Sequence, residues 1–150
     1  MLRRLYPHRY RLGRRNAGQA IVEFALAAPL LCLLMFGIVE FGRYLATRMA
    51  LRHTVREAAR FATTGNVLAD STGTEITRAE SIRRVLLERN SLVHLEPAHV
   101  ELFPADGGGP GDIVQIRVHH DFRFRIPFAA TVFPSGVRID IGTVITNEPF

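Results

Sequence analysis

The fold is decided by the stretch Ala17-Gly18-Gln19-Ala20-Ile21-Val22-Glu23-Phe24, which stands between an arginine-rich leader and a long apolar run. From Phe24 to Val39 no residue carries a charge. With the flanking residues 20–23 and 40–41, the run reaches the roughly 20 residues that an α-helix needs to cross the hydrocarbon core of a bilayer. The sequence therefore predicts one membrane-spanning helix that begins close to Glu23.

The net charge of +5 is concentrated at the N-terminus. Residues 1–18 contain six arginines and no acidic residue, whereas residues 19–150 contain 13 arginines and 14 acidic residues, a charge of −1. Nucleic-acid-binding proteins carry their basic surplus on a folded face, so the sequence argues against a nucleic-acid partner. The positive-inside rule predicts instead that residues 1–18 form a basic cytoplasmic leader and that the C-terminal bulk lies across the membrane.

A cleaved secretory signal is the main alternative for the apolar run. Such a signal needs a small-residue cleavage site after the apolar region. The residues that follow, Glu40-Phe41-Gly42-Arg43-Tyr44-Leu45-Ala46-Thr47-Arg48, contain no Ala-x-Ala pattern at this boundary. We therefore expect the apolar segment to be retained, with Cys32 as a small apolar residue inside it.

The membrane helix is expected to continue as an amphipathic helix, so that residues 19–63 form one long element. Apolar residues recur beyond the membrane at the three- and four-residue steps typical of a helix face: Phe41, Tyr44, Leu45, Leu51, Val55, Ala58, Ala59 and Ala62. A glycine and an asparagine at 65–66 provide a stop signal.

Two features of this helix have alternative interpretations. The basic ridge, defined as Arg48, Arg52, Arg56 and Arg60, is either a solvated or headgroup-facing surface or a site for an acidic partner. Pro29 lacks an N–H group and deprives the Ala25 carbonyl of its helical partner. It is either an ordinary membrane proline or a functional kink.

The rest of the chain is expected to fold as a small α+β domain outside the cytoplasm, residues 77–150, after a loop at residues 64–76 that is rich in turn formers. A second helix is predicted from Thr77, where Thr and Glu have capping-box spacing, to about Asn90. A period of two then predicts strands at 99–103, 112–126 and 137–146, joined by a turn at 104–111 and a loop at 127–136. On the middle strand, one face comprises Val114, Ile116, Val118, His120, Phe122, Phe124 and Ile126. The predicted fold class is α+β, with a small antiparallel sheet packed on the long helix.

No motif typical of an enzyme is present. The glycines of residues 107–111 are not followed by the Lys-Ser/Thr and helix of a phosphate-binding loop, so they favour a hairpin turn. His119 and His120 point to opposite faces of a strand and cannot bind one metal ion together. We therefore expect no catalytic residues, no metal, no cofactor and no small-molecule substrate, and a membrane-tethered enzyme is the least favoured class.

Glu23 is the residue to which the sequence assigns a role. A charged side chain on a membrane helix costs free energy, so an ionisable group there is a functional hypothesis. Glu23 either reaches water at the interface or finds a counter-charge. If the chain is cut after Gly18, the new α-amine of Gln19 and the carboxylate of Glu23 can pair between neighbouring identical subunits. Such pairing would offset much of the cost of burying each charge.

Three segments give the chain a specific resemblance over about residues 17–65, namely Gly18 to Leu31, Phe36 to Arg43 and Ala58 to Ala62. Together they resemble the TadE-like family, which are pilin-like proteins of Tad (tight adherence, Flp-type) pilus systems. The resemblance implies a pilin-like fold and a minor pseudopilin. It implies cleavage after Gly18 by a membrane aspartyl prepilin peptidase, which places Glu23 at the mature fifth position and Phe24 where an aromatic residue is expected.

The same resemblance implies a location and partners. The subunit would be held in the bacterial inner membrane, with its N-terminus in the cytoplasm and its C-terminal domain in the periplasm. Its partners would be the membrane, the prepilin peptidase, other pilin or pseudopilin subunits and the Tad assembly platform. Processing would involve Gly18 and Gln19, and assembly Glu23, Phe24 and Pro29. The alternative function is an unprocessed single-pass anchor that acts as a periplasmic adaptor or sensor.

Overall fold

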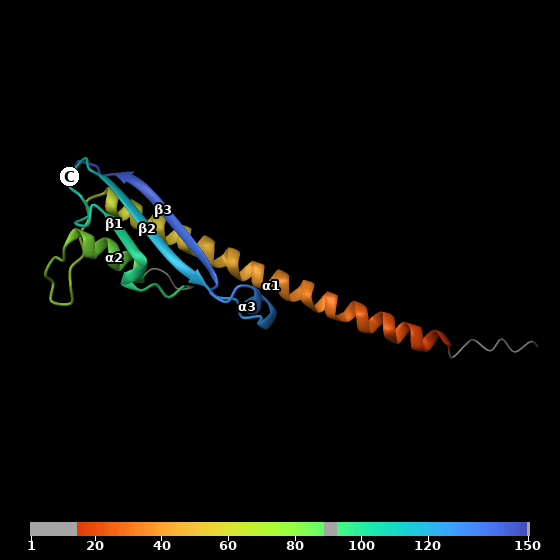
Figure 1. Cartoon of the computed structure of the whole chain (residues 1–150). Coiled ribbons are helices and arrows are strands. Elements are labelled where there is room, and N and C mark those ends of the chain that lie inside the picture. The colour runs from red at the N-terminus through yellow and green to blue at the C-terminus, as the bar shows by residue number, and fades with distance from the viewer. Residues whose placement is uncertain (1–14, 89–92, 150) are drawn as a thin grey trace, which may run out of the picture. The chain divides into compact units, whose positions relative to one another are not determined.

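The structure is a computed structural model that describes residues 15–88 and 93–149. Its elements are α1 (Arg15–Thr63), α2 (Arg78–Glu88), the 3-10 helix η1 (Pro97–His99), β1 (Val100–Phe103), β2 (Ile113–Phe122), α3 (Pro127–Val132) and β3 (Val137–Thr146) (Figure 1). The predicted α+β class is confirmed. Two predictions, the leader up to residue 14 and the end of the second helix near Asn90, lie outside the described residues. The chain divides into two compact units, Met1–Ile38 and Val39–Phe150, and each is described by itself.

The N-terminal unit carries the apolar part of α1. Its large apolar side chains from Ile21 to Ile38 are all exposed, Phe24 to 72% and Leu30 to 70%. Among the described residues, one helix is long and apolar enough to cross a membrane, and it covers Gly18–Thr63. An apolar helix surface without protein cover is typical of a segment that faces lipid. These properties are consistent with a single-pass membrane anchor.

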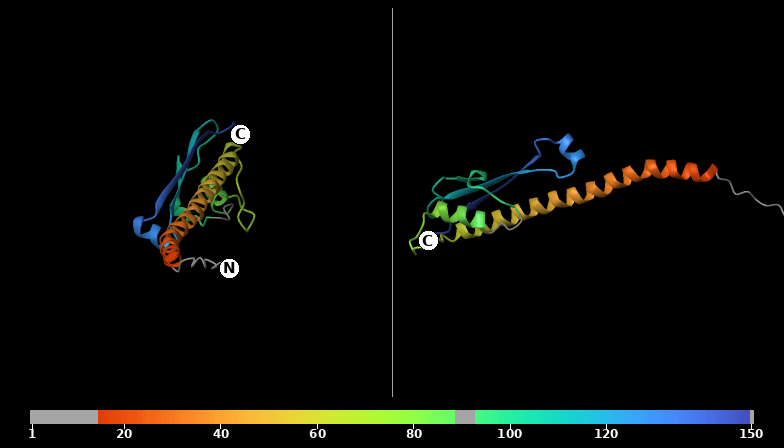
Figure 2. Two further views of the ribbon diagram at one scale, coloured as in Figure 1. Left: turned by 90° about the vertical axis from the view of Figure 1, so that its right-hand side faces the viewer. Right: turned by 90° about the horizontal axis from the view of Figure 1, so that it is seen from below.

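The C-terminal unit contains a three-stranded antiparallel sheet in the order β1-β2-β3. β2 is central and pairs with β3 along its full length, from Ile113 opposite Thr146 to Phe122 opposite Val137. Its other edge pairs with the short β1, with Val100 opposite Val118. Figure 2 shows the sheet lying along the C-terminal half of α1.

The hydrophobic core lies between this sheet and the two helices α1 and α2. α1 contributes Leu51, Val55, Ala58, Ala59 and Ala62, α2 contributes Ala79, Ile82, Val85 and Leu86, and β2 contributes Val114, Ile116, Val118 and Phe122. Each fully buried Leu, Ile or Val contributes about 1.5–3 kcal/mol relative to exposure. The predicted packing of the sheet on the long helix is confirmed.

Several predicted boundaries are corrected. β2 ends at Phe122 rather than residue 126, because β3 begins at Val137, opposite Phe122, and leaves the next residues without a ladder partner. The predicted loop 127–136 contains α3, whose first helical position is Pro127, a favoured place for proline. β1 begins at Val100 because residues 97–99 form a 3-10 turn.

The predicted apolar stripe on α1 divides into two parts. From Leu51 onwards its members belong to the core, and Tyr44 packs against that core. Phe41 and Leu45 instead remain exposed, to 61% and 39%. The stripe therefore exceeds the surface that the sheet and α2 cover.

Other expectations about these elements are confirmed. β3 spans Val137–Thr146 as predicted, and the N–H of Glu80 donates to the Thr77 hydroxyl at 3.3 Å at the start of α2. On the middle strand, Val114, Ile116, Val118 and Phe122 are buried. Phe124 packs only partly buried against the core, since it lies beyond the strand.

Candidate functional site

The predicted processing residues lie near the N-terminal end of α1. Gly18 is the fourth residue of this helix, and both Gly18 and Gln19 are exposed. The first four N–H groups of a helix have no intrahelical acceptor, so this turn opens more readily than the helix interior. A Cβ atom built at Gly18 meets nothing within 4 Å, so the helix itself can accommodate a larger side chain there.

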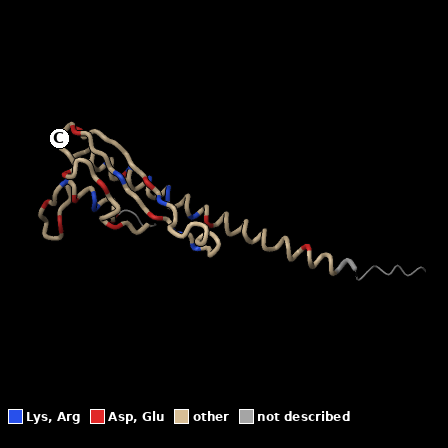
Figure 3. The backbone as a smooth tube through the Cα atoms, viewed as in Figure 1, with Lys and Arg blue, Asp and Glu red and all other residues tan. Residues whose placement is uncertain are grey.

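Glu23 lies one turn further along the same helix, and its side chain is exposed. Within the described part of the chain it makes no hydrogen bond and no ion pair. Glu23 is the only charged residue between positions 19 and 39, and Figure 3 shows this part of α1 largely in tan. Phe24 is exposed beside it, and Pro29 lies within α1 without ending the helix. A counter-charge for Glu23 must therefore come from outside the described residues.

The four arginines of the basic ridge, Arg48, Arg52, Arg56 and Arg60, are exposed on successive turns of α1. None of their side chains forms an ion pair with another residue that the structure describes. Arg56 and Arg60 line an open groove of about 610 Å³, together with His53, Glu57 and Phe61. The ridge is therefore an accessible basic surface.

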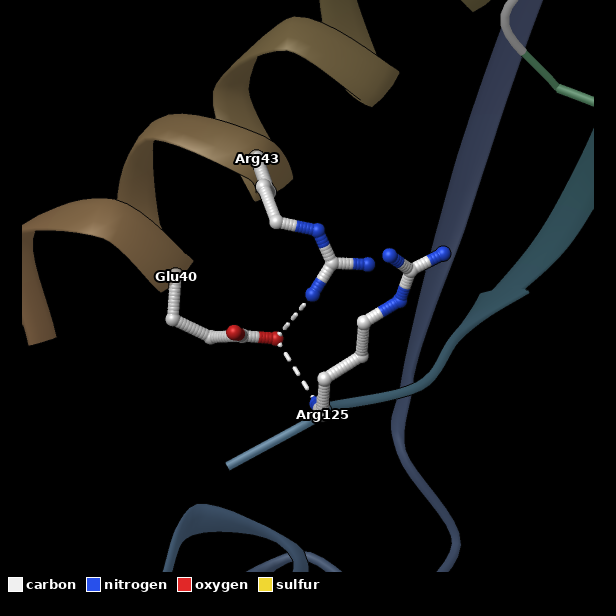
Figure 4. Close-up of polar contacts among 3 residues, drawn as sticks. All are labelled: Glu40, Arg43 and Arg125. Carbon is white, nitrogen blue, oxygen red and sulfur yellow. Dashed lines mark hydrogen bonds and ion pairs between the residues drawn. The ribbon is translucent and has the colours of Figure 1, made fainter. Parts of the chain in front are cut away.

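Glu40 is a site residue that the sequence analysis missed. Its side chain is buried, with 5% of the residue exposed. The Oε1 atom accepts a hydrogen bond from Nη1 of Arg43 at 2.6 Å and another from the backbone N–H of Arg125 at 3.0 Å (Figure 4). The guanidinium of Arg43 also lies over the Phe122 ring, 5.3 Å from its centroid. Glu40 thus holds the chain just before α3 against α1.

One signal for this contact was present in the sequence. Glu40 and Arg43 have the i,i+3 spacing at which opposite charges meet on a helix. The bond to Arg125 had no such signal, because it joins residues 85 positions apart through a backbone group.

The histidines of β2 lie as the strand periodicity requires, on opposite faces. The His119 ring packs edge-on against His99, with centroids 5.3 Å apart. On the other face, His120 has a buried Nδ1 atom without a hydrogen-bond partner in the described chain. Burial lowers the pKa of His120, the electrostatic effect of His99 lowers it further, and the Asp121 carboxylate opposes this in part. The described residues contain no cluster of three or more His, Cys, Asp or Glu side chains suited to a metal ion.

The glycine-rich turn after β1 is tied to the rest of the domain by side chains. Asn147 Nδ2 donates to the Gly109 carbonyl at 2.8 Å, and Arg78 Nε donates to the Gly107 carbonyl at 3.0 Å. Asp112 accepts from the Gly109 N–H at 2.7 Å. The turn is thus a hairpin connection whose carbonyl groups are engaged within the domain.

Comparison with known proteins bears on the N-terminal segment. No curated protein and no solved structure matches the chain. Residues 18–60 match the family model described as TadE-like protein. The match contains Gly18, Glu23, the basic ridge and the Glu40–Arg43 pair. Residues 18–60 are therefore similar to TadE-like proteins, as the sequence motifs predicted.

Proposed function

We propose that the chain is a minor pseudopilin of a Tad-type pilus assembly system, cut after Gly18 by a prepilin peptidase and assembled through α1. The observation that carries this proposal is the TadE-like match over residues 18–60, which falls on a helix with unpartnered apolar side chains. In this proposal the subunit waits in the inner membrane with residues 1–18 in the cytoplasm and residues 77–150 in the periplasm.

The surface of α1 beyond the apolar run supports packing against other subunits. Phe41 and Met49 are exposed to 61% and 70%, with Leu45 between them at 39%. Their four-residue spacing places all three on one helix face. A solvent-exposed apolar stripe of this kind favours burial against another helix. The basic ridge beside it offers an acidic partner subunit a complementary charge.

The chemistry of the cut end supports a role for Glu23. Cleavage after Gly18 converts the N–H of Gln19 into a positively charged amine at a helix N-terminus, where the helix dipole disfavours positive charge. The same dipole favours a carboxylate in this turn. In an apolar bundle, the amine of one subunit and Glu23 of its neighbour would neutralise each other. We propose this pairing as the step that admits a processed subunit to the assembly.

The processing step is tested by mass spectrometry of the membrane-purified protein. We expect the parent chain to have its N-terminus at Gln19. In Gly18→Leu we expect residues 1–18 to remain attached, because the peptidase must fit the residue before the cut. Gly42→Leu is the matched control, since both glycines lie in α1 and a Cβ at either meets nothing within 4 Å. Intact protein in cells that carry pili would contradict processing and favour the unprocessed periplasmic adaptor or sensor.

The pairing step is tested with Glu23→Gln, which keeps the size of the side chain and removes its charge. We expect normal cleavage and at least about a tenfold loss of pili, because an unpaired charge in an apolar bundle is strongly destabilising. Glu101→Gln, at an exposed position on β1, is the control and should leave both readouts unchanged. Normal piliation in Glu23→Gln would refute the pairing.

A further inference from the structure

The short helix α3 presents apolar side chains to solvent. Phe128 is 64% exposed, Val132 is 55% exposed and the adjoining Phe133 is 49% exposed. Phe128 and Val132 are four residues apart and therefore share one face of the helix. The Phe133 ring packs against Phe124, with centroids 5.3 Å apart, so Phe128 and Val132 are the most open part of this surface. It is a compact apolar surface on the connection between β2 and β3.

Glu40 holds the chain that leads into α3 against α1. The carboxylate of Glu40 accepts the N–H of Arg125 at 3.0 Å, and α3 begins two residues later at Pro127. Glu40 itself directly follows Val39, the last residue of the apolar run. Wherever that run leaves the bilayer, α3 is therefore held beside the same boundary. Both partners of the contact lie in the unit Val39–Phe150.

Basic side chains gather in the chain that leads into α3. A hollow of about 370 Å³ there is lined by Arg43, Arg123 and Arg125, with Asp121 as the acidic residue and His120 at its wall. Figure 4 shows the side chains of Arg43 and Arg125 reaching toward the same region beside the Glu40 carboxylate. The planar guanidinium group suits phosphate recognition, because it presents several N–H donors in one fork.

We infer that this α3 face, defined as Phe128, Val132 and Phe133 with Arg123 and Arg125, is a second membrane contact. Its apolar side chains insert into the extracytoplasmic surface of the bilayer that α1 crosses, and its arginines bind anionic phospholipid headgroups. The inference rests on the membrane-anchoring part of the proposed function and is independent of processing and pilus assembly. It makes the domain lie against the membrane before assembly.

The bilayer fits this face better than a protein partner does. The face is continuous, through Glu40 and Arg125, with the point where the apolar run ends. Apolar side chains flanked by basic ones bind interfaces through buried apolar area and electrostatic attraction to anionic lipids together. Because α1 joins the domain to the apolar run without a break in the helix, the interface stays within reach, and even a small face can be engaged.

The test uses the full chain in a Cys32→Ala background, with one new cysteine for an environment-sensitive fluorophore. Val132→Cys reports the α3 face, Leu34→Cys reports the apolar run, and Val144→Cys, 61% exposed near the far end of β3, is the matched exposed control. Each protein is reconstituted into phosphatidylglycerol vesicles that contain nitroxide-labelled lipid. We expect lipid quenching at positions 34 and 132 and none at position 144.

Charge is tested in the same vesicles with Arg123→Gln and Arg125→Gln combined. The backbone bond of Arg125 to Glu40 survives these changes, so α3 keeps its place. We expect quenching at position 132 to fall at least about twofold, and the difference to disappear in high salt, because headgroup attraction is screened there. An unchanged signal would overturn the headgroup contact.

Two further outcomes overturn the inference. If position 132 is as exposed to water as position 144, α3 stays in solution. If position 132 is shielded from aqueous iodide but is not quenched by nitroxide-labelled lipid, a second copy or another protein covers it. Either result leaves the proposed function intact, provided that position 34 is quenched. Absence of quenching at position 34 would remove the membrane anchor and both proposals with it.

Discussion

At the scale of single residues, the buried carboxylate of Glu40 is the strongest polar contact between α1 and the chain that leads into α3. Replacing it by alanine leaves the Arg125 N–H and the Arg43 guanidinium without their acceptor. We predict that Glu40→Ala lowers the free energy of unfolding by about 1–3 kcal/mol, the usual cost of orphaned buried donors. Glu40→Gln should cost less, because its amide oxygen can still accept a hydrogen bond.

Hydrogen exchange of the β2 amides in detergent-solubilised protein measures this loss. Glu101→Gln is the control, since exposed substitutions usually change stability by less than about 0.5 kcal/mol. Unchanged protection of β2 in Glu40→Ala would show that the contact does not stabilise the domain.

The second residue-scale prediction concerns His120. Burial lowers its pKa from the ordinary value of 6.5, His99 lowers it further, and the opposing effect of Asp121 is smaller. Below pH 6.5 the unfolded chain therefore binds a proton that the folded chain does not, so stability falls as the pH falls. Above that pH the group is neutral in both states and has no effect.

We predict that His120→Gln weakens the pH dependence of unfolding between about pH 7.5 and 5.5, because one differential proton is removed. The exposed His94 provides the control, His94→Gln, which should retain the dependence of the parent chain. The measurement is hydrogen exchange at both pH values, corrected for the intrinsic exchange rate. Equal slopes in His120→Gln and the parent would exclude His120 as the source.

At the scale of elements, one arginine joins three of them. Arg78, the first residue of α2, donates to the Ala62 carbonyl at the end of α1 and to the Gly107 carbonyl in the turn after β1. Burial lowers its pKa, but a guanidinium remains protonated in proteins. Each hydrogen bond from such a group contributes about 1.5–3 kcal/mol.

We predict that Arg78→Met, which keeps most of the apolar stem, destabilises the domain by about 2–3 kcal/mol. Arg83→Met, on the same helix and half-buried, is the matched control. Exchange protection in α2 and in the C-terminal turn of α1 should fall together in Arg78→Met. Loss confined to α2 would mean that the arginine does not couple the elements.

The element boundaries show what sequence patterns can and cannot predict. β3 was predicted at both ends because local signals bound it: Gly136, at φ 74°, precedes it, and Asn147 follows it. The end of β2 depends instead on where its partner strand β3 begins. No local pattern in the β2 sequence contains that information. α3 did have a local signal, Pro127, but six residues are too few for a helical period to stand out.

The candidate site divides in the same way. Gly18, Glu23 and the ridge could be predicted as site residues because their signals are spacings within one helix. Glu40 was missed as a site because its second partner is the backbone N–H of Arg125, 85 positions later in the chain. A buried carboxylate that binds a backbone group cannot be distinguished, from sequence alone, from one at the edge of a membrane span.

At the scale of the whole molecule, orientation in the membrane depends on a comparison between the two flanks of the apolar run. The leader carries six arginines, Arg3, Arg4, Arg9, Arg11, Arg14 and Arg15. The other flank carries three within about 15 residues of the span, Arg43, Arg48 and Arg52. The leader therefore carries more arginines than the other flank, by a modest margin. We expect the orientation of the chain in the membrane to depend on these leader arginines.

We predict that changing all six leader arginines to glutamine gives inverted or mixed topology, because the remaining bias then points the other way. Alkaline phosphatase fused after residue 150 measures this, since the enzyme is active only outside the cytoplasm. Its activity should be high in the parent chain and should fall severalfold in the leader variant. Arg48→Gln with Arg52→Gln is the matched control, which removes charge from the opposite flank and should keep full activity. Full activity in the leader variant would mean that these arginines do not orient the chain, and the basic leader would then need another explanation, such as recognition by the peptidase.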